Sequence, residues 1–287
     1  MTVTDIDQKI RPVVFRTDGM NASDGAGVRM RRMLGTPRFD FLDPFLMLDW
    51  FHSDKPQDYL AGFPDHPHRG FETVTYLLHG RMRHADNRGN AGVIEPGGIQ
   101  WMTAGSGIVH SEMPEQENGL LSGFQLWINL PAKDKMVPAG YQEFTPDRIP
   151  VEKRDGASLR VVTGTTSGGV SGPVVDRPTD PFFADIHLDA GATLLEAIGG
   201  DRNAFVLVHD GTLTLAGTDG PQTLGIGNLA VLGTGDVVSA TAGEDGAKFL
   251  LIAARPLGEP VARAGPFVMN TEAELHQAFA DFQNGRF

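Results

Sequence analysis

Short apolar runs with alternating polar positions recur along most of the chain. Examples are FETVTYLLHG from Phe71, GFQLWINL from Gly123, AFVLVHDGTLTLAG from Ala204 and AKFLLIAARP from Ala247. Glycine (36 residues) and proline (19 residues) separate these runs. Short alternating runs divided by turn-forming residues are typical of β-strands. The pattern therefore predicts an all-β protein built as a sandwich or a barrel.

One segment has helical periodicity instead. In NTEAELHQAFADFQNG, residues 270–285, Thr271 stands at an N-cap position and acidic residues follow in the first turn. The apolar positions of this segment then recur at helical spacing, at Leu275, Ala278, Phe279 and Phe282. We expect one short helix there, with its apolar side packed against the sheets.

A weak internal repeat is found when each residue is compared with the residue 130 positions later. TYLLHGRM at 75–82 then aligns with FVLVHDGT at 205–212, and IQWMTAGSG at 99–107 aligns with LAVLGTGDV at 229–237. Identical residues fall on turn glycines and strand positions, as expected for two copies of one β fold. We expect two similar β domains in tandem, joined within residues 131–181.

Composition narrows the possible functions. The formal net charge is -12, which argues against direct nucleic-acid binding, because that partner requires basic surfaces. The chain has no cysteine, so thiol nucleophiles, disulfides and iron–sulfur clusters are excluded. The N-terminal stretch MTVTDIDQKIRP lacks a targeting pattern, and no apolar run is long enough for a membrane span. We expect a soluble cytoplasmic protein with no membrane partner.

Two histidine pairs carry the strongest chemical signal. His66 and His68 in HPHRGFET, and His110 and Glu112 in GSGIVHSEMP, are each separated by one residue. On a strand, such positions share a face about 6.5–7 Å apart, so two facing pairs would form a four-ligand metal site. Because Pro67 has no N–H to donate, we expect the first pair where an edge strand begins.

The ligand types leave two interpretations of the metal open. An octahedral ion would keep two positions free for dioxygen or a chelating substrate, whereas Zn(II) with the same four ligands would form a closed structural site. The remaining histidines are expected to be ordinary hydrogen-bonded residues; they are His52, His79, His84, His187, His209 and His276.

The second copy of the repeat does not keep the candidate ligands. The residues 130 positions after them are Glu196, Ile198, Ala240 and Ala242. We therefore divide the chain into a metal-binding domain at residues 1–135 and a degenerate domain without metal ligands at residues 136–287, ending in the helix. Two other motifs, TAGSG at 103–107 and GAGVRM at 25–30, lack the full patterns of a serine-hydrolase elbow and a dinucleotide loop.

Several long motifs resemble the pirin family of the cupin superfamily: DPFLMLDWF, GFPDHPHRGFETVTYLLHG, IQWMTAGSGIVHSEMP, FQLWINL and GPFVMNT. The resemblance extends from about Val28 to the helix. It implies two tandem cupin barrels of jelly-roll type, with iron bound in the first barrel. Fe(II) is the metal we expect, and Zn, Mn, Ni, Co and Cu are the alternatives. The ligands implied by the resemblance are His66, His68, His110 and Glu112. The usual cupin glutamate corresponds to Glu72, which pirins do not use as a ligand.

The resemblance also implies two alternative functions. The first is a quercetin 2,3-dioxygenase-like enzyme that cleaves flavonols with dioxygen and releases carbon monoxide. In that interpretation Glu112 is the catalytic base, and Arg69, Phe71 and Trp101 are candidate pocket residues. The second is a non-enzymatic, iron-dependent regulatory protein that acts through contacts with a protein partner. We favour the enzyme because the site would have open coordination positions.

Overall fold

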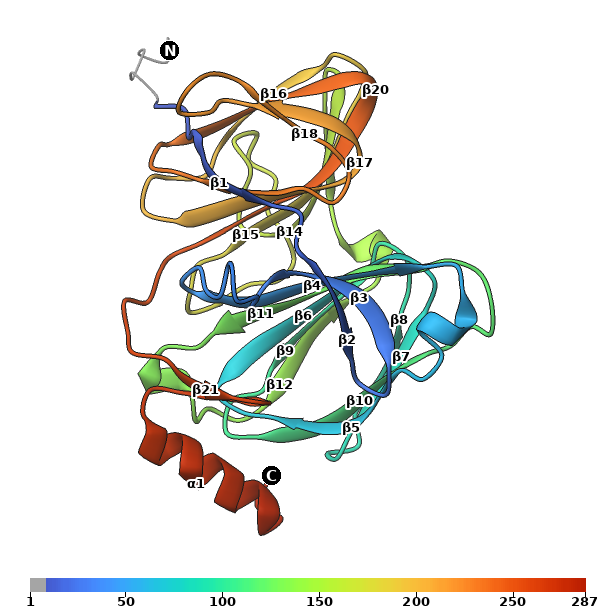
Figure 1. The fold of residues 1–287 in the computed structure, drawn as a ribbon, viewed down its shortest axis with the longest axis vertical. Helices are drawn as coiled ribbons and strands as arrows, with labels where there is room; N and C mark the ends of the chain where they lie inside the picture. Colours follow the sequence, from blue (N-terminus) through green and yellow to red (C-terminus); the bar gives the residue numbers. More distant parts are fainter. Residues whose placement is uncertain (1–8) are drawn as a thin grey trace. The chain divides into compact units, whose positions relative to one another are not determined.

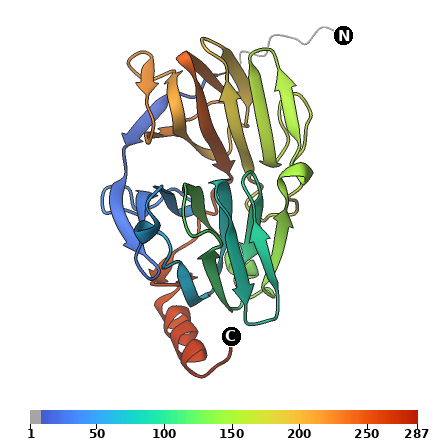
Figure 2. The same ribbon diagram turned by 90° about the vertical axis from the view of Figure 1, so that its right-hand side faces the viewer.

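The computed structural model describes residues 9–287, which form two compact units. The first barrel consists of residues 20–148 and 257–287, and the second barrel of residues 9–19 and 149–256. Strands dominate both units, and α1 (Glu272–Gln283) is the one α-helix of the described residues (Figures 1 and 2). The predicted all-β fold with a late helix is therefore confirmed.

The first barrel contains a seven-stranded and a four-stranded antiparallel sheet. The seven-stranded sheet has the order β12-β9-β6-β11-β4-β3-β2, with strands β2 (Met20–Asp24), β3 (Val28–Leu34), β4 (Phe45–Ser53), β6 (Phe71–His79), β9 (Ile99–Thr103), β11 (Leu121–Asn129) and β12 (Gly140–Phe144). The four-stranded sheet has the order β5-β10-β7-β8, with β5 (Phe63–His68), β7 (Met82–Asp86), β8 (Ala91–Ile94) and β10 (Ile108–Pro114).

The middle of the seven-stranded sheet is buried along most of its length. β6 has seven consecutive buried residues, Phe71 to Leu77, and runs between β11 and β9. Its buried positions include Glu72, Thr73 and Thr75 as well as apolar residues. A buried polar side chain needs a hydrogen-bond partner to offset the loss of water. The polar residues of β6 therefore mark a polar interior rather than a purely apolar core.

The second barrel is held by one large antiparallel sheet. Its main order is β1-β19-β17-β20-β15-β14-β13, while β16 pairs with β20 and β18 pairs with β17. The strands are β1 (Val13–Thr17), β13 (Val151–Arg154), β14 (Ala157–Thr163), β15 (Phe182–Leu188), β16 (Thr193–Ala197), β17 (Asn203–Leu215), β18 (Gln222–Leu224), β19 (Leu229–Leu232) and β20 (Val237–Ala254). Its core is aliphatic, with buried residues such as Leu159, Val206 and Leu251.

The segment 257–287 returns to the first barrel. It contains the two-stranded ribbon of β21 (Ala262–Ala264) and β22 (Phe267–Met269), followed by α1. Thr271 caps the helix in a reciprocal capping box with Glu274, which satisfies backbone N–H groups at the helix start. Leu275 and Ala278 are buried against the ribbon. The predicted cap and the burial of Leu275 and Ala278 are confirmed, whereas Phe279 is only partly buried and Phe282 is 38% exposed.

The compact units differ from the linear division at residue 135 in three places. Residues 136–148, which include β12, belong to the first barrel. Strand β1, near the start of the chain, pairs with β19 of the second barrel, and the last segment packs with the first barrel. The assignment of a metal-binding domain to 1–135 and a metal-free domain to 136–287 stays a prediction. The stretch MTVTDIDQ at the start of the chain lies outside the described residues. Helix α1 falls short of the length and apolar character that a bilayer-crossing helix needs, and it is the only α-helix among residues 9–287.

Candidate metal centre

Three histidines come together where β5 and β10 pair. The antiparallel register places His66 opposite His110 and His68 opposite Ile108. The ring centroid of His66 lies 4.7 Å from that of His68 and 4.4 Å from that of His110. One nitrogen from each of the three rings lies within 4.8 Å of the others. This spacing suits a single ion with three imidazole ligands.

Pro67 lies on an edge strand, because β5 is the outermost strand of its sheet. The strand begins at Phe63, however, so the histidine pair lies near its end and not at its start, as the sequence pattern suggested. Phe63, Pro64 and Asp65 already belong to the strand, and Phe63 lies opposite Glu112 of β10, which explains the difference. The edge position removes the need for an N–H at residue 67.

Burial keeps the inner imidazoles neutral. His68 and His110 are 3% and 1% exposed. Loss of water around the rings is the main reason that the pKa of His68 falls well below its usual value and that the pKa of His110 falls to about 4. A neutral imidazole has a lone pair available for a metal. Neither ring nitrogen of His110 has a hydrogen-bond partner among the described residues, and a coordinated ion would satisfy one of them. The residues therefore fit a divalent metal.

Glu112 is buried close by and is held by hydrogen bonds. Its Oε1 accepts from the Thr75 hydroxyl at 2.7 Å, and its Oε2 accepts from the Gln125 side-chain amide at 3.0 Å. The carboxylate does not belong to the cluster of ligand atoms formed by the three histidines. Its predicted role as fourth ligand and base stays a prediction.

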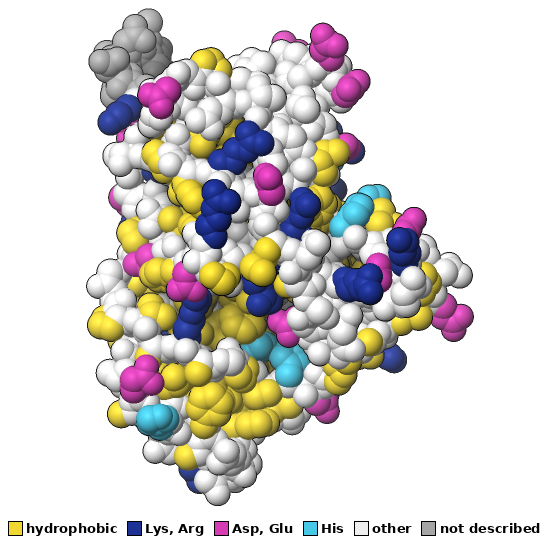
Figure 3. All heavy atoms as spheres, in the orientation of Figure 1, with side chains coloured by type: hydrophobic (Ala, Val, Ile, Leu, Met, Phe, Trp, Pro, Cys, Tyr) yellow, Lys and Arg dark blue, Asp and Glu magenta, His cyan; other side chains and the backbone are white. Residues whose placement is uncertain are grey.

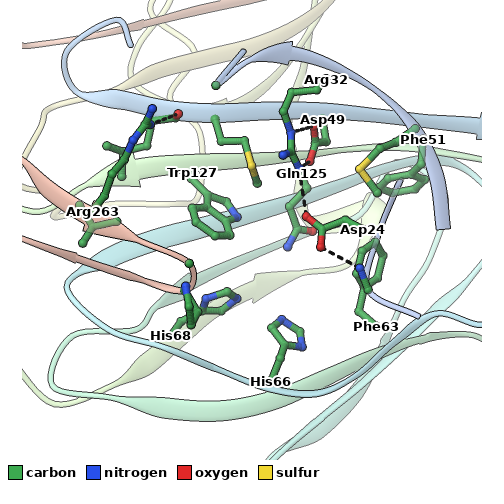
Figure 4. A pocket seen from close by; sticks show the side chains of 18 of the residues that line it. Asp24, Arg32, Asp49, Phe51, Phe63, His66, His68, Gln125, Trp127 and Arg263 are labelled. Carbon is green, nitrogen blue, oxygen red and sulfur yellow. Dashed lines mark hydrogen bonds and ion pairs between the residues drawn. The ribbon is translucent and has the colours of Figure 1, made fainter. Parts of the chain in front are cut away.

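A cavity of about 750 Å³ opens onto His66 and His68. Its walls carry apolar and aromatic side chains, including Phe51, Phe63 and Trp127, together with the amide of Gln125 (Figure 4). Histidine side chains are visible at the bottom of a hollow bordered by hydrophobic and charged side chains in Figure 3. A cavity of this size and lining suits a small aromatic molecule.

The three pocket residues suggested by the sequence do not line this cavity. Arg69 is engaged elsewhere and donates to the backbone oxygen of Ser106 at 2.7 Å and to Asp281 at 2.7 Å. Phe71 and Trp101 are fully buried. Phe71 packs against Trp127, with ring centroids 4.3 Å apart, and of these two residues only Trp127 lines the cavity.

Sequence reasoning also missed a charged group in the cavity wall. Arg32 donates to both oxygens of Asp49, at 2.8 and 2.7 Å, and to Asp24 at 3.0 Å. Figure 4 shows this group above the histidines. Arg32 belongs to a short basic run of β3 that would ordinarily be solvated. The neighbouring aspartate of β4 was the available signal, because Asp49 interrupts the apolar run from Phe45 to Phe51.

Other histidines have partners of their own. His52 Nδ1 lies 2.9 Å from the Ser122 hydroxyl, and His84 Nε2 lies 2.7 Å from Glu143. His187 and His209, expected to be ordinary structural residues, lie together beside Asp185. Glu72 accepts a hydrogen bond from the Thr103 hydroxyl at 2.7 Å, in line with a structural role.

The residues of the second barrel that align with the candidate ligands do not form a histidine cluster. Glu196 is fully buried. Its Oε1 accepts from the backbone N–H of Ser167 at 2.7 Å, and its Oε2 pairs with Arg154 at 2.8 Å. Ala240 and Ala242 belong to the aliphatic core. The position of the first site is thus filled by an ion pair and apolar side chains.

Comparison with known proteins agrees with this geometry. Residues 27–128 match the Pirin family model and residues 183–287 match the model of the Pirin C-terminal cupin domain. A pirin-like protein of Caulobacter vibrioides is 55% identical, with 97% of this chain and 99% of that protein covered. Human pirin is 43% identical, with 92% and 89% covered. A crystal structure of quercetin 2,3-dioxygenase from Acinetobacter baumannii superposes with a TM-score of 0.87 at 31% identity, covering 97% of this chain and 98% of that one. The chain therefore belongs to the pirin family of two-barrel cupin proteins.

Proposed function

We propose that this protein is a metal-dependent dioxygenase that cleaves flavonols such as quercetin. One observation carries the proposal: three histidines have converging nitrogens, and two of them, His66 and His68, line a cavity of about 750 Å³ with aromatic side chains in its walls. The structural likeness to a quercetin 2,3-dioxygenase supports it. Flat polyphenols match such a cavity, because aromatic walls favour stacking and the few polar groups fix orientation.

His66, His68 and His110 would hold the metal, and Glu112 is the fourth ligand that we propose. Fe(II) is the metal we propose. When bound, a divalent metal acts as a Lewis acid that lowers the pKa of a coordinated hydroxyl, and a redox-active one also supports chemistry with dioxygen. Burial lowers the pKa values of His68 and His110, so these two imidazoles need no deprotonation before binding. Neither ring nitrogen of His110 is engaged in a hydrogen bond with a described residue.

The remaining residues would bind and orient the substrate. Trp127 offers a ring face beside His68, with centroids 5.1 Å apart, and Phe51 and Phe63 line the same cavity. Glu112 would take the proton of the flavonol 3-hydroxyl at Oε2, the oxygen that faces Gln125. The burial of Glu112, which is 1% exposed, would exclude bulk water from this proton transfer.

The test is oxygen uptake with quercetin after anaerobic loading with Fe(II). We expect metal-dependent uptake with release of carbon monoxide. Glu112→Gln keeps the shape of the side chain but removes the base, and should lower turnover by at least about a hundredfold. His66→Ala should lose the metal and the activity together. Bound metal is measured in every variant, so that a loss of chemistry is distinguished from a loss of loading.

Two outcomes would count against this function. Normal turnover by Glu112→Gln would remove Glu112 from the chemistry. A fully loaded protein without oxygen uptake would instead favour the non-enzymatic alternative, in which the iron state controls contacts with a protein partner. Binding of a partner that changes with iron oxidation state would then be the next measurement.

A further inference from the structure

A second group of metal-ligating side chains lies in the second barrel, on residues unrelated to the cupin site. His209 Nε2 is 2.9 Å from Oδ1 of Asp185, and His187 Nε2 is 3.5 Å from Oδ2. One ligand atom from each of the three residues lies within 4.8 Å of the others. The three side chains therefore converge on one point from two strands.

The strands explain why these residues meet. Asp185 and His187 are two positions apart on β15, and so share one face of the sheet. The intervening Ile186 and the preceding Ala184 belong to the aliphatic core of the second barrel, which places Asp185 and His187 on the opposite face. His209 comes from β17, which is separated from β15 only by β20.

A β-bulge directs His209 toward this point. Val208 pairs with Phe249 and Asp210 pairs with Lys248, although these two partners are consecutive on β20. His209 is thus the additional residue of the bulge. A bulge changes the direction of side chains relative to a regular strand. The ring of His209 can therefore reach across β20 to Asp185.

Distances and ligand types agree with a transition-metal ion. In a tetrahedral zinc site with bonds of about 2.0–2.1 Å, neighbouring ligand atoms lie about 3.3–3.4 Å apart. The two ring nitrogens lie at comparable distances from the Asp185 carboxylate, with His209 Nε2 2.9 Å from Oδ1 and His187 Nε2 3.5 Å from Oδ2. Two imidazoles and one carboxylate are common zinc ligands and leave a fourth position for water.

The surroundings allow an ion to enter. The side chain of His187 is 48% exposed, while those of Asp185 and His209 are 4% and 5% exposed. On the intervening strand, the cationic side chain of Lys248 lies opposite His187. Its ammonium is bound by Asp210 at 2.8 Å, and this pairing reduces its repulsion of a bound cation.

We propose that Asp185, His187 and His209 form a second divalent-metal site that binds Zn(II). This site does not derive from the repeat, because its residues do not correspond to His66, His68, His110 or Glu112 of the first barrel. Its function is binding of the ion itself, which would link β15 to β17 across β20. The proposal is independent of the dioxygenase activity.

The experiment counts zinc ions per chain by competition with a chromophoric zinc chelator. The starting protein carries His66→Ala and His68→Ala, so that the first site is disabled. We expect this double variant to bind one Zn(II) per chain. Addition of His187→Ala, an exposed position whose replacement should leave folding intact, is expected to weaken that binding by about a hundredfold or more, since loss of a direct ligand should exceed the 10- to 100-fold effect of outer-shell changes.

His276→Ala is the matched control, because His276 is an exposed histidine on α1 outside both clusters. It should leave zinc binding unchanged. Far-ultraviolet circular dichroism checks that each variant is folded. The proposal is overturned if the double variant binds no zinc, or if the zinc it binds is held equally well after His187→Ala. Asp185→Asn, which keeps the size of the side chain, gives a second test and should weaken zinc binding as well.

Discussion

At the scale of single residues, Gln125 connects the cavity to the buried carboxylate. Its amide N–H donates to Glu112 and its oxygen lies 3.1 Å from the Thr75 hydroxyl, while the same residue lines the cavity. Thr75 and Gln125 face each other in the β6–β11 register. Two neighbouring strands therefore fix the direction of the Glu112 carboxylate, which lies on the other sheet.

Replacement of Gln125 by leucine should separate proton transfer from metal binding. Gln125→Leu keeps about the same volume but removes the donor to Glu112 Oε2. A hydrogen bond to a charged group contributes about 1.5–3 kcal/mol, so we expect kcat with quercetin to fall about 10- to 100-fold. Bound metal per chain should stay the same.

Gln283→Leu, at an exposed position of α1, is the control for this change and should have the kcat of the parent protein. A Gln125→Leu protein with unchanged kcat would show that the amide does not orient the base. A protein that loses its metal would show that Gln125 instead supports the metal ligands.

Residue spacing predicted part of this site. The one-residue gaps predicted that the members of each pair share a face, because strand geometry puts alternate residues on one side. The approach of His66 and His68 to His110 comes from the pairing of β5 with β10. Spacing could not predict that Glu112 is held by Thr75 and Gln125, since this depends on which strands become neighbours. The same holds for the bulge at His209, which no local pattern in the sequence indicates.

At the scale of elements, Lys135 ties the last segment to the first barrel. Its ammonium donates to the backbone oxygens of Gly70 at 2.8 Å and Val268 at 3.0 Å, and to Asn129 Oδ1 at 2.7 Å. Gly70 has a positive φ of 86°, and a Cβ at this position would lie 2.0 Å from the Val268 oxygen. The chain beside His68 therefore approaches β22 more closely than any residue with a side chain would allow.

Lys135→Met should destabilise this contact. Three oxygens would lose a buried charged donor, so we expect the free energy of unfolding to fall by about 2–4 kcal/mol, measured by denaturant unfolding. Burial lowers the pKa of Lys135 to about 8 from 10.5. Between these values the unfolded chain binds more protons, so this residue should make stability rise with pH, and the rise should be absent in Lys135→Met.

Lys133→Met provides the comparison, because the Lys133 side chain is 80% exposed. Its replacement should change stability by less than about 0.5 kcal/mol. If both variants unfold at the same denaturant concentration, the hydrogen bonds of Lys135 do not hold the segment 257–287 in place.

At the scale of the whole molecule, each barrel takes a segment from the far end of the chain. The sequence predicted two β domains because strand and turn positions match between residues that lie 130 positions apart. It did not predict that β1 joins the second barrel or that residues 257–287 join the first. Such exchanges depend on sheet edges that are far apart in sequence, and the strands that fill them have no distinctive pattern of their own.

Truncation should show that the first barrel needs residues 257–287 for its stability and for metal binding. A chain ending at Pro256 loses the cavity-lining residues 263–266 and Val268. The truncation also removes the Asp281 carboxylate that accepts from Arg69 and the Val268 oxygen that accepts from Lys135. We expect its thermal unfolding temperature to fall by more than about 10 °C and its metal loading to drop.

A chain ending at Asn270 keeps β21 and β22 and loses α1 together with the residues on either side of that helix. The Lys135 bond to Val268 remains, whereas the Arg69–Asp281 pair is removed. This shorter deletion should have a smaller effect on both measurements. Equal metal binding and unfolding temperatures for the two truncated chains would contradict the proposed role of β21 and β22.

The placement of residues 257–287 also determines the order of events during synthesis. Domains near the N-terminus generally fold first as a chain leaves the ribosome. Here the strands that carry His66, His68 and His110 emerge early, yet the segment that closes their cavity is translated after the entire second barrel. Between these two events the cavity of the nascent chain lacks the wall residues that the segment 257–287 contributes. We expect stable metal binding to follow release from the ribosome, which would protect the growing chain from taking up metal before its cavity is closed.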